Sequence, residues 1–124
     1  MNLTKEQLEM LKRLKPAIDK YMGDWQEGDW YLYGKEPEIP FEVEANIFRD
    51  NGRCTAELRM YQEFDVLRIP SFCTPDGKRC LAEMLTDKGK EYLYEYYHTS
   101  ITILLRSNDY YTAILKALII QEGV

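Results

Sequence analysis

The sequence has few of the residues on which common active sites and metal centres depend. It contains one histidine and three cysteines in 124 residues. Cys54, Cys73 and Cys80 form no CxxC pair, and their spacing does not suit a zinc site that would also use His98. We therefore expect reduced thiols that act as small apolar residues, no metal and no cofactor.

Long apolar runs are also missing. No run approaches the roughly 18 residues that a membrane-spanning helix needs. Residues 1–15 are charged throughout and lack the apolar stretch of a signal peptide. We therefore expect a cytoplasmic protein that makes no contact with a membrane. With 45% hydrophobic and 30% charged residues, the chain is typical of a globular protein, and its length predicts a single domain, 1–124.

Basic residues are scarce in the middle of the chain. Residues 24–65 contain four basic and eleven acidic side chains, whereas residues 66–124 contain seven of each. The net charge of −5 therefore arises in the middle third, since residues 1–23 carry five basic and three acidic side chains. Binding to a phosphate backbone requires a basic footprint, so we expect no direct contact with nucleic acid.

Both ends of the chain carry helix signals. Thr4 and Gln7 have the spacing of a capping box, and apolar residues then recur at helical intervals as far as Ile18. Pro16 predicts either a kink or the start of a second short helix, and Gly23 predicts the end. A last helix is expected to begin after Ser107 or Asn108. Its predicted buried face comprises Tyr111, Ile114, Leu115, Leu118 and Ile119.

Strand signals lie between these helices. Asn51-Gly52 is the preferred pair for a two-residue hairpin turn and predicts a hairpin over 41–62, with Ala45 opposite Leu58 and Ile47 on the same apolar face. Further strands are expected at 30–33, 66–69 and 101–105, a turn at 74–77, and a short helix at 78–85. The stretch 92–97 is expected to be a strand because tyrosine favours strands, although Leu93, Tyr96 and Tyr97 also fit a helix. The order predicts an α+β fold in which the N-terminal and C-terminal helices pack on an antiparallel sheet.

Two groups of residues are candidates for a binding surface. Aromatic side chains with a polar tip are enriched at binding surfaces but are also ordinary core residues of small sheets. Outward-facing carboxylates on a strand suit a docking surface, although they also serve simply to keep an edge soluble. The candidate residues are Trp25, Trp30 and Tyr33 in the aromatic group and Glu42, Glu44 and Glu57 in the acidic group.

Three segments together resemble a type of small uncharacterised protein encoded by bacterial phages and prophages. They are the first helix followed by GDWY at 28–31, the stretch from IP at 69–70 through PDG at 75–77 to LAEML at 81–85, and AILKAL at 113–118 before the closing QEGV. The resemblance implies an accessory protein of unknown function. It supplies no catalytic or binding residues.

No catalytic constellation is recognisable, so the leading hypothesis is a non-enzymatic accessory protein of phage type that binds another protein. The acidic middle third favours a basic partner, and the oligomeric state stays open. A second hypothesis is a small-molecule binding module with an aromatic pocket around Trp25, Trp30 and Tyr33. A third is an enzyme that uses a cysteine nucleophile with His98 as its base.

Overall fold

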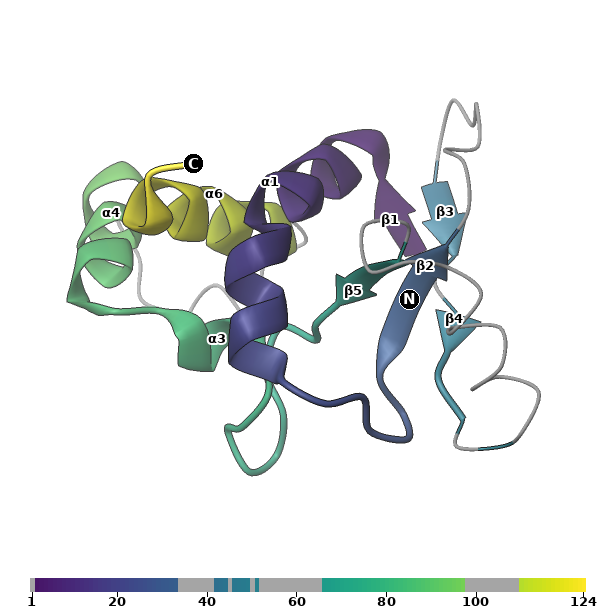
Figure 1. The fold of residues 1–124 in the computed structure, drawn as a ribbon. Coiled ribbons are helices and arrows are strands. Elements are labelled where there is room, and N and C mark those ends of the chain that lie inside the picture. The colour runs from purple at the N-terminus through teal and green to yellow at the C-terminus, as the bar shows by residue number, and fades with distance from the viewer. Residues whose placement is uncertain (1, 34–41, 45, 50, 52–65, 98–109) are drawn as a thin grey trace. The chain divides into compact units, whose positions relative to one another are not determined.

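The computed structural model describes residues 2–33, 42–44, 46–49, 51, 66–97 and 110–124 (Figure 1). Contacts within the chain define two compact units, Met1–Pro70 and Ser71–Val124. Antiparallel strands and one long helix form the first unit, and helices dominate the second. The α+β class is therefore confirmed, whereas the single domain stays a prediction.

The first unit begins with strand β1 (Asn2–Thr4), which leads directly into helix α1 (Lys5–Met22). The capping box is confirmed: the Gln7 backbone N–H donates to Thr4 Oγ1 at 3.2 Å, and the Thr4 backbone N–H donates to Gln7 Oε1 at 2.9 Å. These bonds satisfy donors that the first helical turn leaves without intrahelical partners. The short strand before the cap was not predicted.

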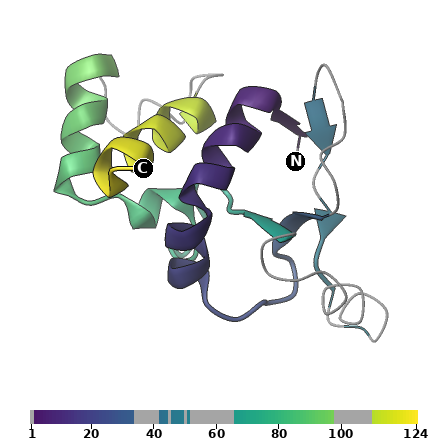
Figure 2. The same ribbon diagram turned by 45° about the horizontal axis from the view of Figure 1, so that its top comes forward.

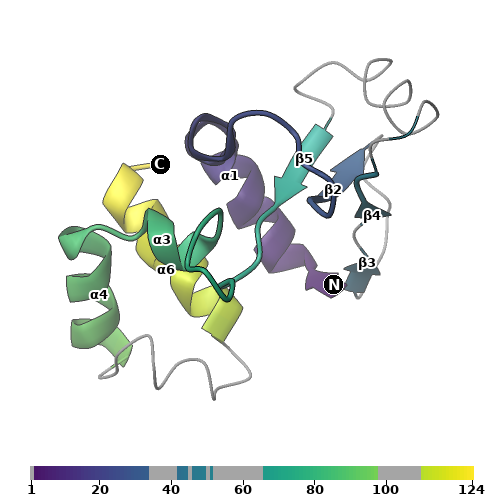
Figure 3. The same cartoon turned by 90° about the horizontal axis from the view of Figure 1, so that it is seen from below.

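Helix α1 runs through Pro16 without ending. Figures 1 and 3 show its axis changing direction within its length, as expected where a proline removes one backbone hydrogen bond. The helix stops at Gly23, whose φ of 67° is accessible to glycine at little cost. Its buried side is apolar and comprises Met10, Leu11, Leu14, Ile18 and Met22.

A three-stranded antiparallel sheet has the order β4 (Asn46–Ile47), β2 (Trp30–Tyr33) and β5 (Val66–Ile69). Figure 3 labels these strands, and Figure 2 shows the same ribbon from another side. The strands predicted at 30–33 and 66–69 are confirmed. Strand β3 (Glu42–Glu44) pairs instead with β1. Helix α1 packs on β5 and β1, and all four residues of β5 are buried.

The predicted hairpin falls largely outside the described residues. Its first arm is extended at β3 and β4, but its second arm and its pairing of Ala45 with Leu58 are not described. The expected inward face is wrong at one position, because Ile47 is 41% exposed while the next residue, Phe48, is buried. Phe48 lies beyond the end of β4 and packs with Tyr31 and Val66.

The second unit contains α3 (Leu81–Met84), α4 (Asp87–Tyr97) and α6 (Tyr110–Glu122). The short helix expected at 78–85 is shorter than predicted. The strand expected at 92–97 is wrong, because these residues belong to α4. Gly89 and Leu93, one helical turn apart, are both buried, and packing of α4 on α6 outweighs the strand preference of the tyrosines.

The buried face of α6 is confirmed except at Ile119, which is half-buried. Ala113 and Ala117 are also buried on this helix and were not predicted. The caps expected at Ser107 or Asn108 and the strand at 101–105 lie outside the described residues.

A close approach at Gly89 fixes how α4 meets the rest of its unit. A Cβ atom at this position would lie 2.6 Å from Gln121 Oε1 and 2.7 Å from Leu85 Cδ2. The Gln121 side chain cannot move freely, because its Oε1 accepts from the Thr86 backbone N–H at 2.7 Å and its Nε2 donates to the Met84 carbonyl at 2.9 Å. The junction between α3 and α4 therefore depends on a glycine that faces a glutamine.

We predict that Gly89→Ala destabilises the protein by about 1–3 kcal/mol, the usual range for overpacking a core position. In an exposed helix the same change would stabilise by up to about 1 kcal/mol. Chemical denaturation would measure the loss, with the exposed neighbour Lys90→Ala as the control. A stability equal to or above that of the parent would show that the contact with Gln121 is not tight.

Candidate functional site

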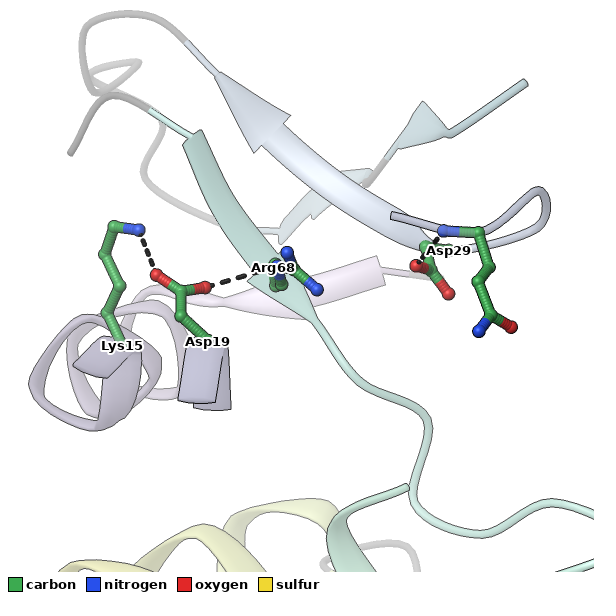
Figure 4. A network of polar contacts seen from close by, with 5 residues as sticks. Lys15, Asp19, Asp29 and Arg68 are labelled. Carbon is green, nitrogen blue, oxygen red and sulfur yellow. Dashed lines mark hydrogen bonds and ion pairs between the residues drawn. The ribbon is translucent and has the colours of Figure 1, made fainter. Parts of the chain in front are cut away.

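Arg68 on β5 is the one charged side chain that is buried in the described part of the chain, at 8% exposure. Its Nε lies 3.3 Å from Asp19 Oδ1 on α1, and its guanidinium stacks 4.2 Å above the ring centroid of Trp25. Figure 4 shows the Asp19 carboxylate between Arg68 and Lys15, which forms a second ion pair one helical turn earlier. Arg68 is thus held by a carboxylate and an aromatic face together.

Trp25 belongs to an aromatic cluster on the Arg68 face of the sheet. Its ring meets Tyr31 edge-on with centroids 5.9 Å apart, and it packs against Phe48 at 5.7 Å. Tyr31 is the register partner of Arg68, and Val66 lies two residues from Arg68 on β5, so these side chains share one face of the sheet. Trp25 therefore joins this apolar cluster to the Arg68 guanidinium.

The loop between α1 and β2 is folded so that Trp25 reaches this cluster. Asp29 Oδ2 accepts from the Gln26 backbone N–H at 2.9 Å, a contact drawn in Figure 4. The backbone N–H of Gly28 donates to the Phe48 carbonyl at 2.9 Å, and the Phe48 N–H donates to the Asp29 carbonyl at 2.7 Å. Gly28 has a φ of 96°, a conformation in which any other residue would be strained.

These contacts make the Arg68 cluster a packing element of the first unit. Arg68 covers one face of the Trp25 ring, the surface on which an aromatic pocket would receive a ligand. Trp30 alternates with Tyr31 along β2 and therefore lies on the opposite face of the sheet. Tyr33 pairs with Val66 through the backbone. The structure thus separates Trp25 from Trp30, and the proposed aromatic pocket stays a prediction.

The acidic candidates are only partly described. Glu42 and Glu44 lie on β3, opposite Thr4 and Asn2, whereas Glu57 lies outside the described residues. Two further carboxylates, on Asp24 and Glu27, are exposed in the loop between α1 and β2. The docking role of the acidic third stays a prediction.

A second candidate site is the segment 71–82, called here the 71–82 loop. The backbone N–H of Leu81 donates to the Ser71 carbonyl at 2.9 Å, and that of Ala82 donates to the Phe72 carbonyl at 2.9 Å. Figure 1 shows the teal chain before α3 running out from α3, α4 and α6 and returning. The two bonds close its base, and the Phe72 ring meets Tyr110 of α6 with centroids 4.8 Å apart.

The tip of the 71–82 loop is ordered by its own polar groups. The predicted turn at 74–77 is confirmed, since the Gly77 N–H donates to the Thr74 carbonyl at 3.0 Å. Thr74 Oγ1 lies 2.9 Å from Asp76 Oδ1 and 2.7 Å from the Lys78 carbonyl, and its single hydrogen serves one of them at a time. The Lys78 N–H also donates to Asp76 Oδ1, at 3.1 Å, and this bond, followed by that from Thr74, lowers the pKa of Asp76.

Arg79 completes this loop in an unusual conformation. Its φ of 52° makes it the one residue other than glycine with positive φ in the described ranges. This left-handed region costs an ordinary side chain roughly 1–2 kcal/mol. Beyond the base of the loop, five residues are exposed to solvent: Cys73, Pro75, Asp76, Gly77 and Lys78.

The groups considered for catalysis are only partly described. Cys80 is buried, as expected of a structural thiol, but Cys73 is exposed, and Cys54 and His98 lie outside the described residues. Burial raises the pKa of Tyr111, with the neighbouring Tyr110 adding to the effect, so its phenol stays protonated at neutral pH. The proposed Cys–His enzyme is therefore untested.

Among the residues that the structure describes, no group of three or more His, Cys, Asp or Glu side chains could hold a metal ion. No helix in that part of the chain is both long enough and apolar enough to cross a membrane. Cytoplasmic location and the lack of a cofactor stay predictions.

Comparison of the chain with protein-family models, with curated proteins and with solved structures finds no match. The functional proposal therefore rests on the geometry of the chain itself.

Sequence reasoning named Trp25 as a candidate but missed Arg68 and Asp19, although a signal was present. The strand VLRI places one arginine within an otherwise apolar run. A charge in a buried strand requires a partner. A carboxylate on helix α1 or an aromatic ring was the candidate partner for this arginine. The same reasoning found the turn at 74–77 but not the bonds that close the loop around it.

We predict that Arg68→Lys lowers the free energy of unfolding by about 1–2 kcal/mol, because an ammonium group cannot stack on Trp25 as the planar guanidinium does. Lys15→Gln should cost less than about 0.5 kcal/mol, since it removes a partly solvated ion pair on the surface of one helix. Urea denaturation compares the two. Equal losses would contradict the assigned role of the stacked arginine.

We predict that Arg79→Gly leaves the free energy of unfolding within about 1 kcal/mol of the parent and on the stabilising side, because glycine adopts positive φ without the steric cost. Lys78→Gly is the matched control, because Lys78 has no positive φ to relieve. It should lose about 0.5–1 kcal/mol to the greater entropy of the unfolded chain. A larger loss at Arg79 than at Lys78 would refute the strained conformation.

Proposed function

We propose that this chain is a non-enzymatic accessory protein that acts by binding another protein through the 71–82 loop. The observation that carries the proposal is the combination of exposure and order at the tip of this loop. The tip is exposed to solvent, yet hydrogen bonds among three polar groups hold its backbone in one shape, in which one residue adopts positive φ despite the cost.

The conformational cost at Arg79 favours a role of the loop in recognition. A loop that merely connects β5 to α3 does not require a left-handed arginine, which costs roughly 1–2 kcal/mol. Local strain of this kind persists where the surrounding structure enforces it, and it is concentrated at functional sites. A loop that is already ordered loses less conformational entropy on binding, so more of its contact energy contributes to affinity.

The base of the loop provides the rigid support that such a role needs. The Phe72 ring is buried against Tyr110, the first residue of α6, and the two backbone bonds from Leu81 and Ala82 close the loop there. Binding residues commonly lie on loops that a rigid scaffold positions. The exposed apolar side chains Tyr94, Ile120 and Val124 in the same unit are a weaker argument, because isolated apolar residues are common on protein surfaces.

The sequence supports two further features of the proposal. The resemblance to small phage and prophage proteins suits an accessory role without catalysis. The acidic middle third, which includes the exposed Asp24 and Glu27, would attract a basic partner and raise its rate of association. A basic protein of the host cell is therefore the proposed kind of partner.

The proposal predicts that Cys73→Ala combined with Pro75→Ala weakens binding of the partner about tenfold, the effect of losing roughly 1.4 kcal/mol of contact energy. Both changes lie at the exposed tip and should leave the fold intact. Retention of proteins from a cell lysate on the immobilised chain, quantified by mass spectrometry and repeated with the purified partner by calorimetry, measures the effect.

Lys88→Ala combined with Lys90→Ala is the matched control, because it removes exposed lysines from α4 and leaves the loop unchanged. The control should retain the partner at the level of the parent. Equal loss in both variants, or a partner whose retention does not depend on the loop, would refute the assignment of this loop as the contact.

A further inference from the structure

We propose that the folded 71–82 loop protects the Asp76–Gly77 peptide, a site prone to isomerise to iso-aspartate, and that the Thr74 hydroxyl sets the degree of this protection. An aspartate followed by glycine is chemically prone to isomerisation, because glycine leaves the attacking backbone nitrogen unhindered. Both residues are exposed at the tip of the 71–82 loop. The inference rests on the geometry of the loop and is independent of the proposed function.

The reaction requires only the protein and water. The Gly77 backbone nitrogen attacks Cγ of the protonated Asp76 carboxyl group, so an N–Cγ bond forms and a Cγ–O bond breaks. The departing oxygen leaves as water, with the amide proton of Gly77 and the carboxyl proton balancing the loss, and a five-membered succinimide remains. Hydrolysis at one carbonyl restores aspartate. Hydrolysis at the other gives iso-aspartate, in which the backbone passes through the former side chain and the mass is unchanged.

The loop geometry opposes the first step at both reacting atoms. The Gly77 N–H is engaged with the Thr74 carbonyl at 3.0 Å, which makes the nitrogen harder to deprotonate. The Asp76 carboxylate is held through Oδ1 by the Lys78 N–H at 3.1 Å and faces Thr74 Oγ1 at 2.9 Å. Rotation of the carboxyl group toward the Gly77 nitrogen would break these bonds.

The protonation state of the Asp76 carboxyl group also opposes the reaction. The bonds from Lys78 and Thr74 lower the pKa of Asp76, so a smaller fraction of the carboxyl group is protonated at any pH above that value. Only the protonated form loses water readily, so protection should be strongest near neutral pH and should decline as the pH falls toward the usual range of an aspartate. Thr74 therefore affects both the position and the charge of the reacting group.

A comparison of three proteins at pH 6 and 37 °C tests the inference. The parent, Thr74→Val and Thr74→Ser are incubated and digested, and iso-aspartate at position 76 is quantified by mass spectrometry with fragmentation that distinguishes the isomers. Thr74→Val keeps the shape of the side chain and removes the hydroxyl group. We expect it to accumulate iso-aspartate about fivefold faster than the parent, the factor given by one hydrogen bond worth about 1 kcal/mol.

Thr74→Ser is the matched control, because it keeps the hydroxyl group and should react at the rate of the parent. A synthetic peptide of residues 72–79 gives the unprotected rate, which should exceed that of the folded parent. Equal rates in the parent and Thr74→Val, or a serine variant as fast as the valine variant, would overturn the role of Thr74. A folded parent that reacts as fast as the peptide would overturn protection by the loop. Because the readout is the isomer content and no partner is present, either result leaves the test of binding unaffected.

Discussion

Two backbone hydrogen bonds, from Leu81 to the Ser71 carbonyl and from Ala82 to the Phe72 carbonyl, determine the shape of the second unit near α3. They satisfy the first N–H groups of a helix whose N-cap residue, Cys80, offers no side-chain cap. They also bring the two ends of the loop together. Once the ends are fixed, the remaining chain is short enough for its own polar groups to order it.

The first unit contains a buried charge, the guanidinium of Arg68. Removing an arginine from water is costly unless a partner compensates, and here one carboxylate and one indole ring share that role. The arrangement links α1 and the loop that follows it to β5, a strand more than forty positions after α1 in the sequence. The resulting cluster has a role in packing of the first unit, whereas the proposed contact with a partner lies in the 71–82 loop.

Sequence signals predicted the elements that depend on local chemistry. The capping box at Thr4, the strands at 30–33 and 66–69 and the turn at 74–77 each follow from a few neighbouring residues. The features that sequence reasoning missed depend on distant contacts. Helix α4 was expected to be a strand over 92–97 because tyrosine favours strands, whereas the Gly89 surface that meets α6 is visible only in three dimensions. The stacking of Arg68 on Trp25 likewise joins segments more than forty positions apart.

Recognition through the 71–82 loop requires that its tip is ordered before any partner binds. Backbone hydrogen exchange, followed residue by residue by NMR in the free protein, tests this order directly. We expect the N–H groups of Gly77 and Lys78 to exchange more slowly than those of an unstructured peptide, because each donates a hydrogen bond within the loop. Exchange of both groups at the rate of an unstructured peptide would show that the tip is not ordered.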